Sequence, residues 1–183
     1  MTQRAHDLRR LDVAAFAAEG AVLEGRWPLA DMARLLDSVD GRAEANRRAE
    51  AAWRAAGEQT PPRGLAPRVW LHLTASTQVA MVCQRCLGSV TVPLDVDRRF
   101  GFVAGEAEAA ALDADSDDDV LALERWLDVQ ALVEDELLLA LPLVPRHADC
   151  APPAAIAGAA PPPDEAVAEH PFAALQALHR KAH

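Results

Sequence analysis

Two stretches of alternating apolar and polar residues, separated by a short turn that contains cysteines, constrain the fold of this chain most strongly. In residues 67–83, Val69, Leu71 and Leu73 alternate with side chains of the opposite face, and residues 89–103 show the same period of two. Because successive side chains of a strand point to opposite faces, this period predicts two strands. The segment CQRCLG joins them directly. We therefore expect an antiparallel β-hairpin with cysteines in its turn.

The other periodic segments predict a mixture of helices and strands. Residues 29–41 and 127–145 place apolar side chains at helical spacing; Gly41 is a plausible end for the first helix, and Asp128 and Pro142 are typical of the start and end of the second. The whole pattern predicts an α+β fold, in which an antiparallel β-sheet packs against a few helices. The remaining predicted elements are a short helical segment containing Leu8, Leu11 and Phe16, a strand over 21–27, and a strand over 42–56, where odd-numbered apolar positions outweigh the helical propensity.

The negative charge of the chain is concentrated in one segment. The formal net charge is −10, and residues 106–136 hold twelve acidic residues and one basic residue. Like-charge repulsion and the near absence of large apolar side chains predict a solvated, disordered acidic loop over residues 106–119. This loop is either a plain insertion between structured elements, or a functional segment that mimics RNA or docks a basic partner. The rest of the chain is close to neutral and rich in arginine, so the overall acidity does not exclude local contact with RNA.

The composition also bears on location and domain organisation. No run of 18 apolar residues is present, the N-terminus lacks a signal-peptide pattern, and three cysteines suit a reducing compartment. We therefore expect a cytoplasmic protein with no membrane partner. Residues 1–150 are predicted to form a single domain, residues 151–169 a Pro/Ala-rich linker, and residues 170–183 a short C-terminal helix.

All three cysteines and one histidine fall into two pairs with the same spacing. The pairs are Cys83-x-x-Cys86 in the hairpin turn and His147-x-x-Cys150 after the second helix. Tetrahedral zinc takes four nitrogen or sulfur ligands, so the two pairs predict a closed structural zinc site. Such a site leaves no open coordination position and predicts no zinc-dependent hydrolysis. It would join the tip of the hairpin to the chain that follows the helix.

Three other interpretations of these residues remain open at this point. A redox CxxC motif normally opens a helix after a strand, whereas here a second strand is expected. In the second interpretation, the thiols are inert and the histidine is a surface residue. In the third, Cys83 and Cys86 form a disulfide only on oxidation. No phosphate-binding glycine loop, nucleophile elbow or HExxH motif is present, and no catalytic residues are predicted.

Three consecutive acidic residues, Glu134, Asp135 and Glu136, raise the alternative of paired catalytic carboxylates. Adjacent positions on a helix point about 100° apart, so these side chains do not converge on one substrate atom. An acidic first half of a helix, favourable to its dipole, is the simpler interpretation. Glu136 falls on the apolar side of the predicted helix, and we expect it to be partly buried with an arginine partner.

Two sequence blocks carry a resemblance to a known family. CQRCL (83–87) followed by a strand, and VEDELLLALPLVPRH (133–147) followed by Cys150, resemble the YceD family, the large ribosomal RNA subunit accumulation proteins. The segment HPFAALQALHRK (170–181) is similar to the closing segment of proteobacterial members. The resemblance spans residues 11–181 and is specific in the two blocks. Many relatives have another cysteine near the position of His147. This difference affects which residues would bind the metal, and does not affect the family assignment.

The resemblance implies a cytoplasmic, non-enzymatic factor for accumulation or processing of 23S ribosomal RNA and for large-subunit assembly. It also implies a mixed α+β domain and a role for the three cysteines. The expected partner is the ribosomal RNA precursor or a maturation protein, with no DNA partner. The alternatives are a zinc-stabilised protein–protein adaptor that does not act directly on RNA, and a thiol oxidoreductase. The arginines available for RNA contact are Arg47, Arg48, Arg54, Arg63, Arg68, Arg98 and Arg99.

Overall fold

The long hairpin predicted from the alternating pattern forms the centre of the fold. The structure is a computed structural model that describes residues 6–60, 68–114, 118–123 and 125–154. Strands β3 (Arg68–Val82) and β4 (Ser89–Val103) pair antiparallel along their whole length. Both strands match the residues in which the period of two was found, so this prediction is confirmed.

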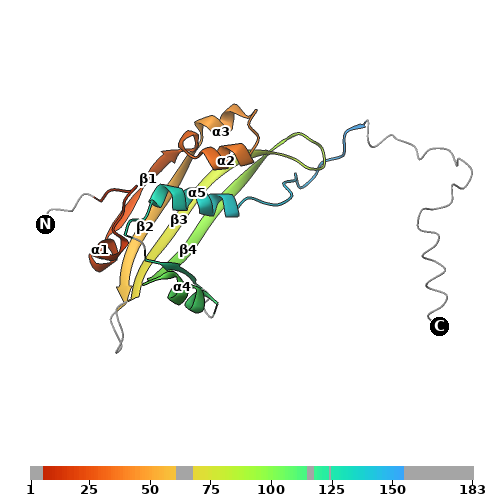
Figure 1. Cartoon of the computed structure of the whole chain (residues 1–183). Helices are drawn as coiled ribbons and strands as arrows, with labels where there is room; N and C mark the ends of the chain where they lie inside the picture. The colour runs from red at the N-terminus through yellow and green to blue at the C-terminus, as the bar shows by residue number, and fades with distance from the viewer. Residues whose placement is uncertain (1–5, 61–67, 115–117, 124, 155–183) are drawn as a thin grey trace, which may run out of the picture.

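The hairpin is extended into a five-stranded sheet with the order β1-β2-β3-β4-β5 (Figure 1). Strands β1 (Val22–Pro28) and β2 (Glu50–Thr60) add to β3 as an antiparallel meander. Strand β5 (Asp119–Ala122) pairs with β4 in the parallel direction. The α+β class is confirmed, and the sheet is antiparallel across β1 to β4. The parallel fifth strand was not predicted.

Three helices cover one face of the sheet and enclose the hydrophobic core: α1 (Val13–Ala18), α2 (Ala33–Ser38) and α5 (Val129–Leu139) (Figure 1). Asp128 caps α5 as expected, because its side chain accepts a hydrogen bond from the N–H of Ala131. Burial of large apolar side chains between the helices and the sheet drives this packing. The most completely buried of them include Phe16, Leu29, Met32, Leu35, Leu71, Leu73, Leu94, Val133 and Leu137.

The prediction of one continuous helix over 29–41 is wrong. The chain forms a short 3₁₀ helix, η1 (Leu29–Asp31), and then α2, with the non-helical residue Met32 between them. Glu134 of α5 explains the break, because its Oε1 accepts hydrogen bonds from the N–H groups of Arg34 and Leu35 at 2.8 and 3.2 Å. A side chain from another helix therefore caps the start of α2.

The predicted strand over 42–56 is correct only in its second half. Residues Glu44–Arg48 form helix α3, and β2 begins at Glu50. Asn46, which is 1% exposed, anchors this helix beside β3. Its Nδ2 donates to the carbonyl of Ala80 and its Oδ1 accepts from the N–H of Ala80, at 2.9 and 2.7 Å. The asparagine side chain thus continues the hydrogen bonding of β3 where the pairing with β2 has ended.

The prediction of a disordered acidic loop over 106–119 is also wrong for most of its length. Residues Glu106–Asp113 form helix α4, and β5 begins at Asp119. Helix α4 follows Gly105, which has a φ of +89°, and it buries Ala109. The alanines of this segment favour a helix despite the acidic charge. Asp113, the last residue of α4, holds the start of β5 in place, because its carboxylate accepts a hydrogen bond from the N–H of Val120 at 2.9 Å.

The predicted linker and C-terminal helix fall almost wholly outside the described residues, which end at Ala154. No helix in the described part of the chain combines the length and the apolar character needed to cross a membrane.

Candidate metal centre

The turn between β3 and β4 holds the first cysteine pair. The N–H of Cys83 donates to the carbonyl of Gly88 at 2.8 Å, and the N–H of Leu87 donates to the carbonyl of Cys83 at 2.9 Å. Leu87 adopts a φ of +61°, a backbone conformation that non-glycine residues rarely take. These features fold the CxxC segment into a compact knuckle in which Cys83 is fully buried.

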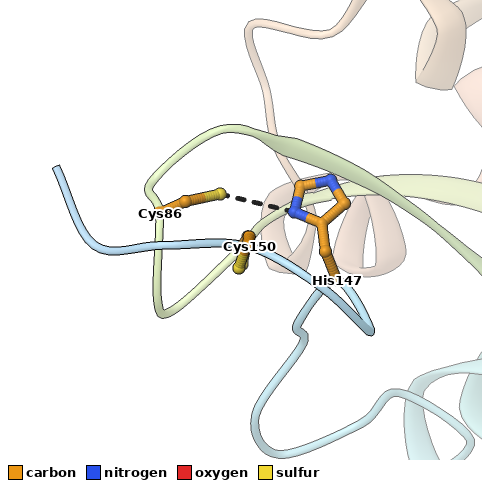
Figure 2. A group of neighbouring side chains, drawn as sticks. Cys86, His147 and Cys150 are labelled. Carbon is orange, nitrogen blue, oxygen red and sulfur yellow. Dashed lines mark hydrogen bonds between the residues drawn. The ribbon is translucent and has the colours of Figure 1, made fainter.

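The loop after α5 brings the second pair to the same place. The N–H of Gln84 donates to the carbonyl of Pro145 at 2.9 Å, and Nη1 of Arg85 donates to the carbonyl of Cys150 at 3.1 Å. Figure 2 shows Cys86 on the hairpin turn facing His147 and Cys150 on the neighbouring loop. The two pairs, 60 residues apart in the chain, therefore meet as the sequence predicted.

The distances among the four ligand atoms suit a tetrahedral metal ion. All four atoms lie within 4.8 Å of one another. The Sγ atoms of Cys83 and Cys150 are 3.7 Å apart, and Sγ of Cys86 is 3.3 Å from Nδ1 of His147. Sulfur and nitrogen ligands at the usual zinc distances lie roughly 3.5–3.8 Å apart in a tetrahedron. The group can thus hold a metal ion with little rearrangement.

A backbone carbonyl orients the histidine toward the cluster. Nε2 of His147 donates to the carbonyl of Ser89 at 3.1 Å, which leaves the lone pair of Nδ1 free for a metal. Metal-binding histidines commonly use their second nitrogen in this way. Sequence reasoning missed Ser89, and no side-chain signal could have found it because the contact uses only the main chain.

The electrostatic surroundings favour a thiolate at Cys83. Backbone N–H groups donate hydrogen bonds to the Cys83 sulfur and lower its pKa to about 5, although burial acts in the opposite direction. The N–H of Cys86 has the largest effect, and those of His147 and Arg85 add to it. Burial and the neighbouring thiols raise the pKa of Cys150. The two shifts have opposite directions, so the surroundings favour the ionised form at Cys83 and the protonated form at Cys150. A divalent cation would favour the ionised form of all three thiols.

The acidic triplet of α5 has structural partners. The carboxylates of Glu134 and Asp135 both bind the guanidinium of Arg34, and Glu134 also caps α2. Glu136 is 8% exposed and lies 3.5 Å from Nε of Arg98, so the expected burial and arginine partner are both confirmed. Burial raises the pKa of Glu136.

Several of the arginines expected to contact RNA are held in ion pairs. Arg98 binds Glu136, and Arg99 stacks 4.0 Å from the ring of Trp70 and lies 3.6 Å from Glu58. These side chains are partly neutralised by their acidic neighbours. Arg48 forms an ion pair with Glu44. Three of the others are exposed: Arg47 on α3, Arg54 on β2 and Arg68 on β3. Arg63 lies outside the described residues.

Comparison with known proteins identifies the family of the chain. No solved structure matches the chain. A protein-family model, described as large ribosomal RNA subunit accumulation protein YceD, matches residues 71–179. The match covers more than half of the chain and includes most of β3, all of β4 and α5, and all four residues of the Cys/His cluster. The chain therefore belongs to the YceD family of large ribosomal RNA subunit accumulation proteins.

Proposed function

We propose that this protein is a non-enzymatic cytoplasmic factor that supports the accumulation or processing of 23S ribosomal RNA and the assembly of the large ribosomal subunit. The observation that carries the proposal is the Cys/His cluster, which lies wholly inside the region that matches the family. The cluster joins two segments of the backbone and is formed by four protein ligands. This arrangement is typical of a structural site rather than a catalytic one.

In this proposal Cys83, Cys86, His147 and Cys150 hold one structural zinc ion. The donor set of three thiols and one imidazole is typical of zinc, and a fully protein-ligated ion supplies rigidity rather than chemistry. The ion fixes the loop after α5 against the tip of the hairpin. Side chains on both segments then present a defined surface to a partner.

We propose direct contact with the ribosomal RNA precursor at this end of the molecule. Arg42, Arg47 and Arg146 are exposed, and the structure gives none of them an ion pair with a described residue. The hydrogen bonds between Asn46 and Ala80 place the neighbouring Arg47 beside the last residues of β3, close to the cluster. The acidic helix α4 lies at the other end of the hairpin (Figure 1). The acidic charge of α4 is therefore remote from the cluster end and does not oppose a phosphate backbone there.

The test combines a deletion strain with purified protein. Loss of the gene should reduce mature 23S RNA and large subunits, and wild-type protein should restore them. A triple Arg42/Arg47/Arg146→Gln variant should bind precursor RNA more weakly and show a smaller slope of log affinity against log salt. A triple Arg54/Arg68/Arg125→Gln variant, which removes the same charge elsewhere, is the control. Normal 23S RNA in the deletion strain would contradict the proposed function.

A protein–protein adaptor is the second candidate because apolar side chains are exposed near the same cluster. Leu87, Leu143 and Val144 are 60%, 100% and 51% exposed. Exposed apolar groups of this kind often mark a protein contact. If this candidate is correct, a Leu143→Asp variant will lose a co-purifying maturation protein and impair 23S accumulation, while binding of purified protein to RNA stays undetectable or insensitive to salt.

A further inference from the structure

The outer edge of β1 presents backbone groups that no described residue pairs. The N–H of Gly57 donates to the carbonyl of Ala21, and the N–H of Leu29 donates to the carbonyl of Ala49, both at 2.9 Å. Hydrogen-bonded pairs alternate along an antiparallel ladder, so the odd-numbered residues of this segment bond to β2. The backbone groups that point away from β2 belong to Val22, Glu24, Arg26 and Pro28.

This edge has little of the protection that sheet edges usually carry. Strand β1 lies at the end of the sheet, spans seven residues and has Val22 42% exposed (Figure 1). Natural edges are commonly blocked by bulges, inward-pointing charges or covering elements. Among the described residues, Pro28 at the end of β1 removes a single N–H donor, and the exposed Glu24 and Arg26 repel only those strands that place like charges opposite them. The edge is therefore able to accept another strand.

The charges on β1 select the strand that fits. Glu24 and Arg26 point to the same side of the sheet, the side opposite the helices, and both are exposed. In an antiparallel pair of two β1 strands centred on Gly25, Glu24 of each copy lies directly opposite Arg26 of the other. A shift by two residues in either direction places Glu24 opposite Glu24 or Arg26 opposite Arg26. Opposite charges stabilise such cross-strand pairs and like charges destabilise them.

We propose that two copies of this chain associate through β1, antiparallel and with Gly25 opposite Gly25. This register places the outward backbone groups of Glu24 in one copy against those of Arg26 in the other, as a hydrogen-bonded pair requires. On the other side of the sheet it places Leu23, which is half-buried, opposite Trp27 of the second copy. The result is one continuous sheet across a twofold axis, with the helices of both copies on the same side.

The contacts that Glu24 and Arg26 make within their own chain are weak enough to allow this. Nη1 of Arg26 lies 3.8 Å from Oε2 of Glu50, and both side chains are at least half exposed. Glu24 is opposite Arg54 in the β1–β2 register, without an ion pair between them. Exposed pairs of this kind contribute little to stability, so the two charges remain available for a second copy.

Charge reversal tests the register directly. Sedimentation equilibrium of the full chain should show an approach with rising concentration to twice the monomer mass of 19.6 kDa. Glu24→Arg and Arg26→Glu should each abolish dimerisation, because each places like charges opposite one another at both sites. An equimolar mixture of these two variants should restore it, because every opposing pair then has opposite charges. Glu108→Arg on α4, an equal change of charge at an exposed site, is the control.

Hydrogen exchange gives a second readout that does not depend on the variants. The amides of Val22, Glu24 and Arg26 should exchange quickly at low concentration and at least tenfold more slowly in the dimer, whereas the amide of Gly25 should be protected in both. A protein that stays monomeric up to millimolar concentration would overturn the proposal. This result would also hold if a strand from a different protein, rather than a second copy, occupied the edge. So would a dimer that both charge reversals leave intact.

Discussion

Replacing Glu134 with alanine should destabilise the fold by about 3 kcal/mol, although the residue is not part of the Cys/His cluster. Glu134 is 9% exposed and links α5 to the start of α2. Its Oε1 accepts from the N–H groups of Arg34 and Leu35, and its Oε2 accepts from the guanidinium of Arg34 at 2.9 and 3.2 Å. The substitution removes all of these bonds at once.

The magnitude follows from the surroundings of each lost bond. Loss of a helix cap costs about 1 kcal/mol. The N–H of Leu35, a residue with 0% exposure, is left without an acceptor, which costs about 1–3 kcal/mol. The side chain of Arg34 is 53% exposed, so its ion pair contributes at most about 1 kcal/mol. For a chain of this size, a loss of about 3 kcal/mol corresponds to a fall in Tm of roughly 6–12 °C.

Urea denaturation, followed by tryptophan fluorescence and far-UV circular dichroism, measures this loss. Asp135→Ala is the matched control, because Asp135 binds only the exposed side of Arg34 and its loss should cost under about 1 kcal/mol. Glu134→Gln retains an oxygen acceptor for both N–H groups and should lie between the two. If Glu134→Ala costs no more than Asp135→Ala, the cap contributes nothing and the reasoning is refuted.

Three further predictions concern packing, pH and metal. In Gly57→Ala the new Cβ would lie 2.7 Å from Cδ1 of Phe16, so denaturation should show a loss of about 1–3 kcal/mol; no loss would mean that α1 moves aside freely. Because burial raises the pKa of Glu136, its contribution to stability is complete below about pH 4 and is lost as the pH rises through the raised value. The stability of Glu136→Gln relative to wild type should therefore increase between pH 4 and 7 in parallel urea titrations, and a difference that does not change with pH would argue against this. Chelation should accelerate hydrogen exchange at the amides of Gln84 and Leu87, which bond within the knuckle and its neighbouring loop, while β2 stays protected; unchanged exchange would mean that no metal holds the loop.

The sequence predicted those parts of the fold in which local pattern and burial agree. The alternation in β3 and β4 matches their buried face, and Asp128 caps α5 where a capping residue was expected. The pairing of the four metal-binding candidates followed from the spacing of the two pairs. These signals are short-range, or depend on residue types that have few other uses.

The sequence could not predict the parts of the fold that distant residues determine. The break at Met32 depends on Glu134, which lies 100 residues away from the helix that it caps. Helix α3 depends on Asn46 bonding to Ala80, although the local pattern there favoured a strand. The acidic segment became helical because Ala109 is buried, a contact that charge arithmetic does not reveal. Tertiary contacts thus decided the break at Met32 and the position of α3, whereas α4 also follows the helical propensity of its alanines.

The metal content of the untagged protein tests the central claim most directly. Native mass spectrometry and elemental analysis should find one zinc ion per chain, and X-ray absorption should show three sulfur ligands and one nitrogen ligand at about 2.3 and 2.0 Å. Cys83→Ser and His147→Ala should each reduce zinc affinity, whereas Ser89→Ala should not, because Ser89 contributes only its backbone carbonyl. Protein purified from zinc-replete cells with no bound metal, and with a hairpin turn as stable as in the presence of added zinc, would contradict the account.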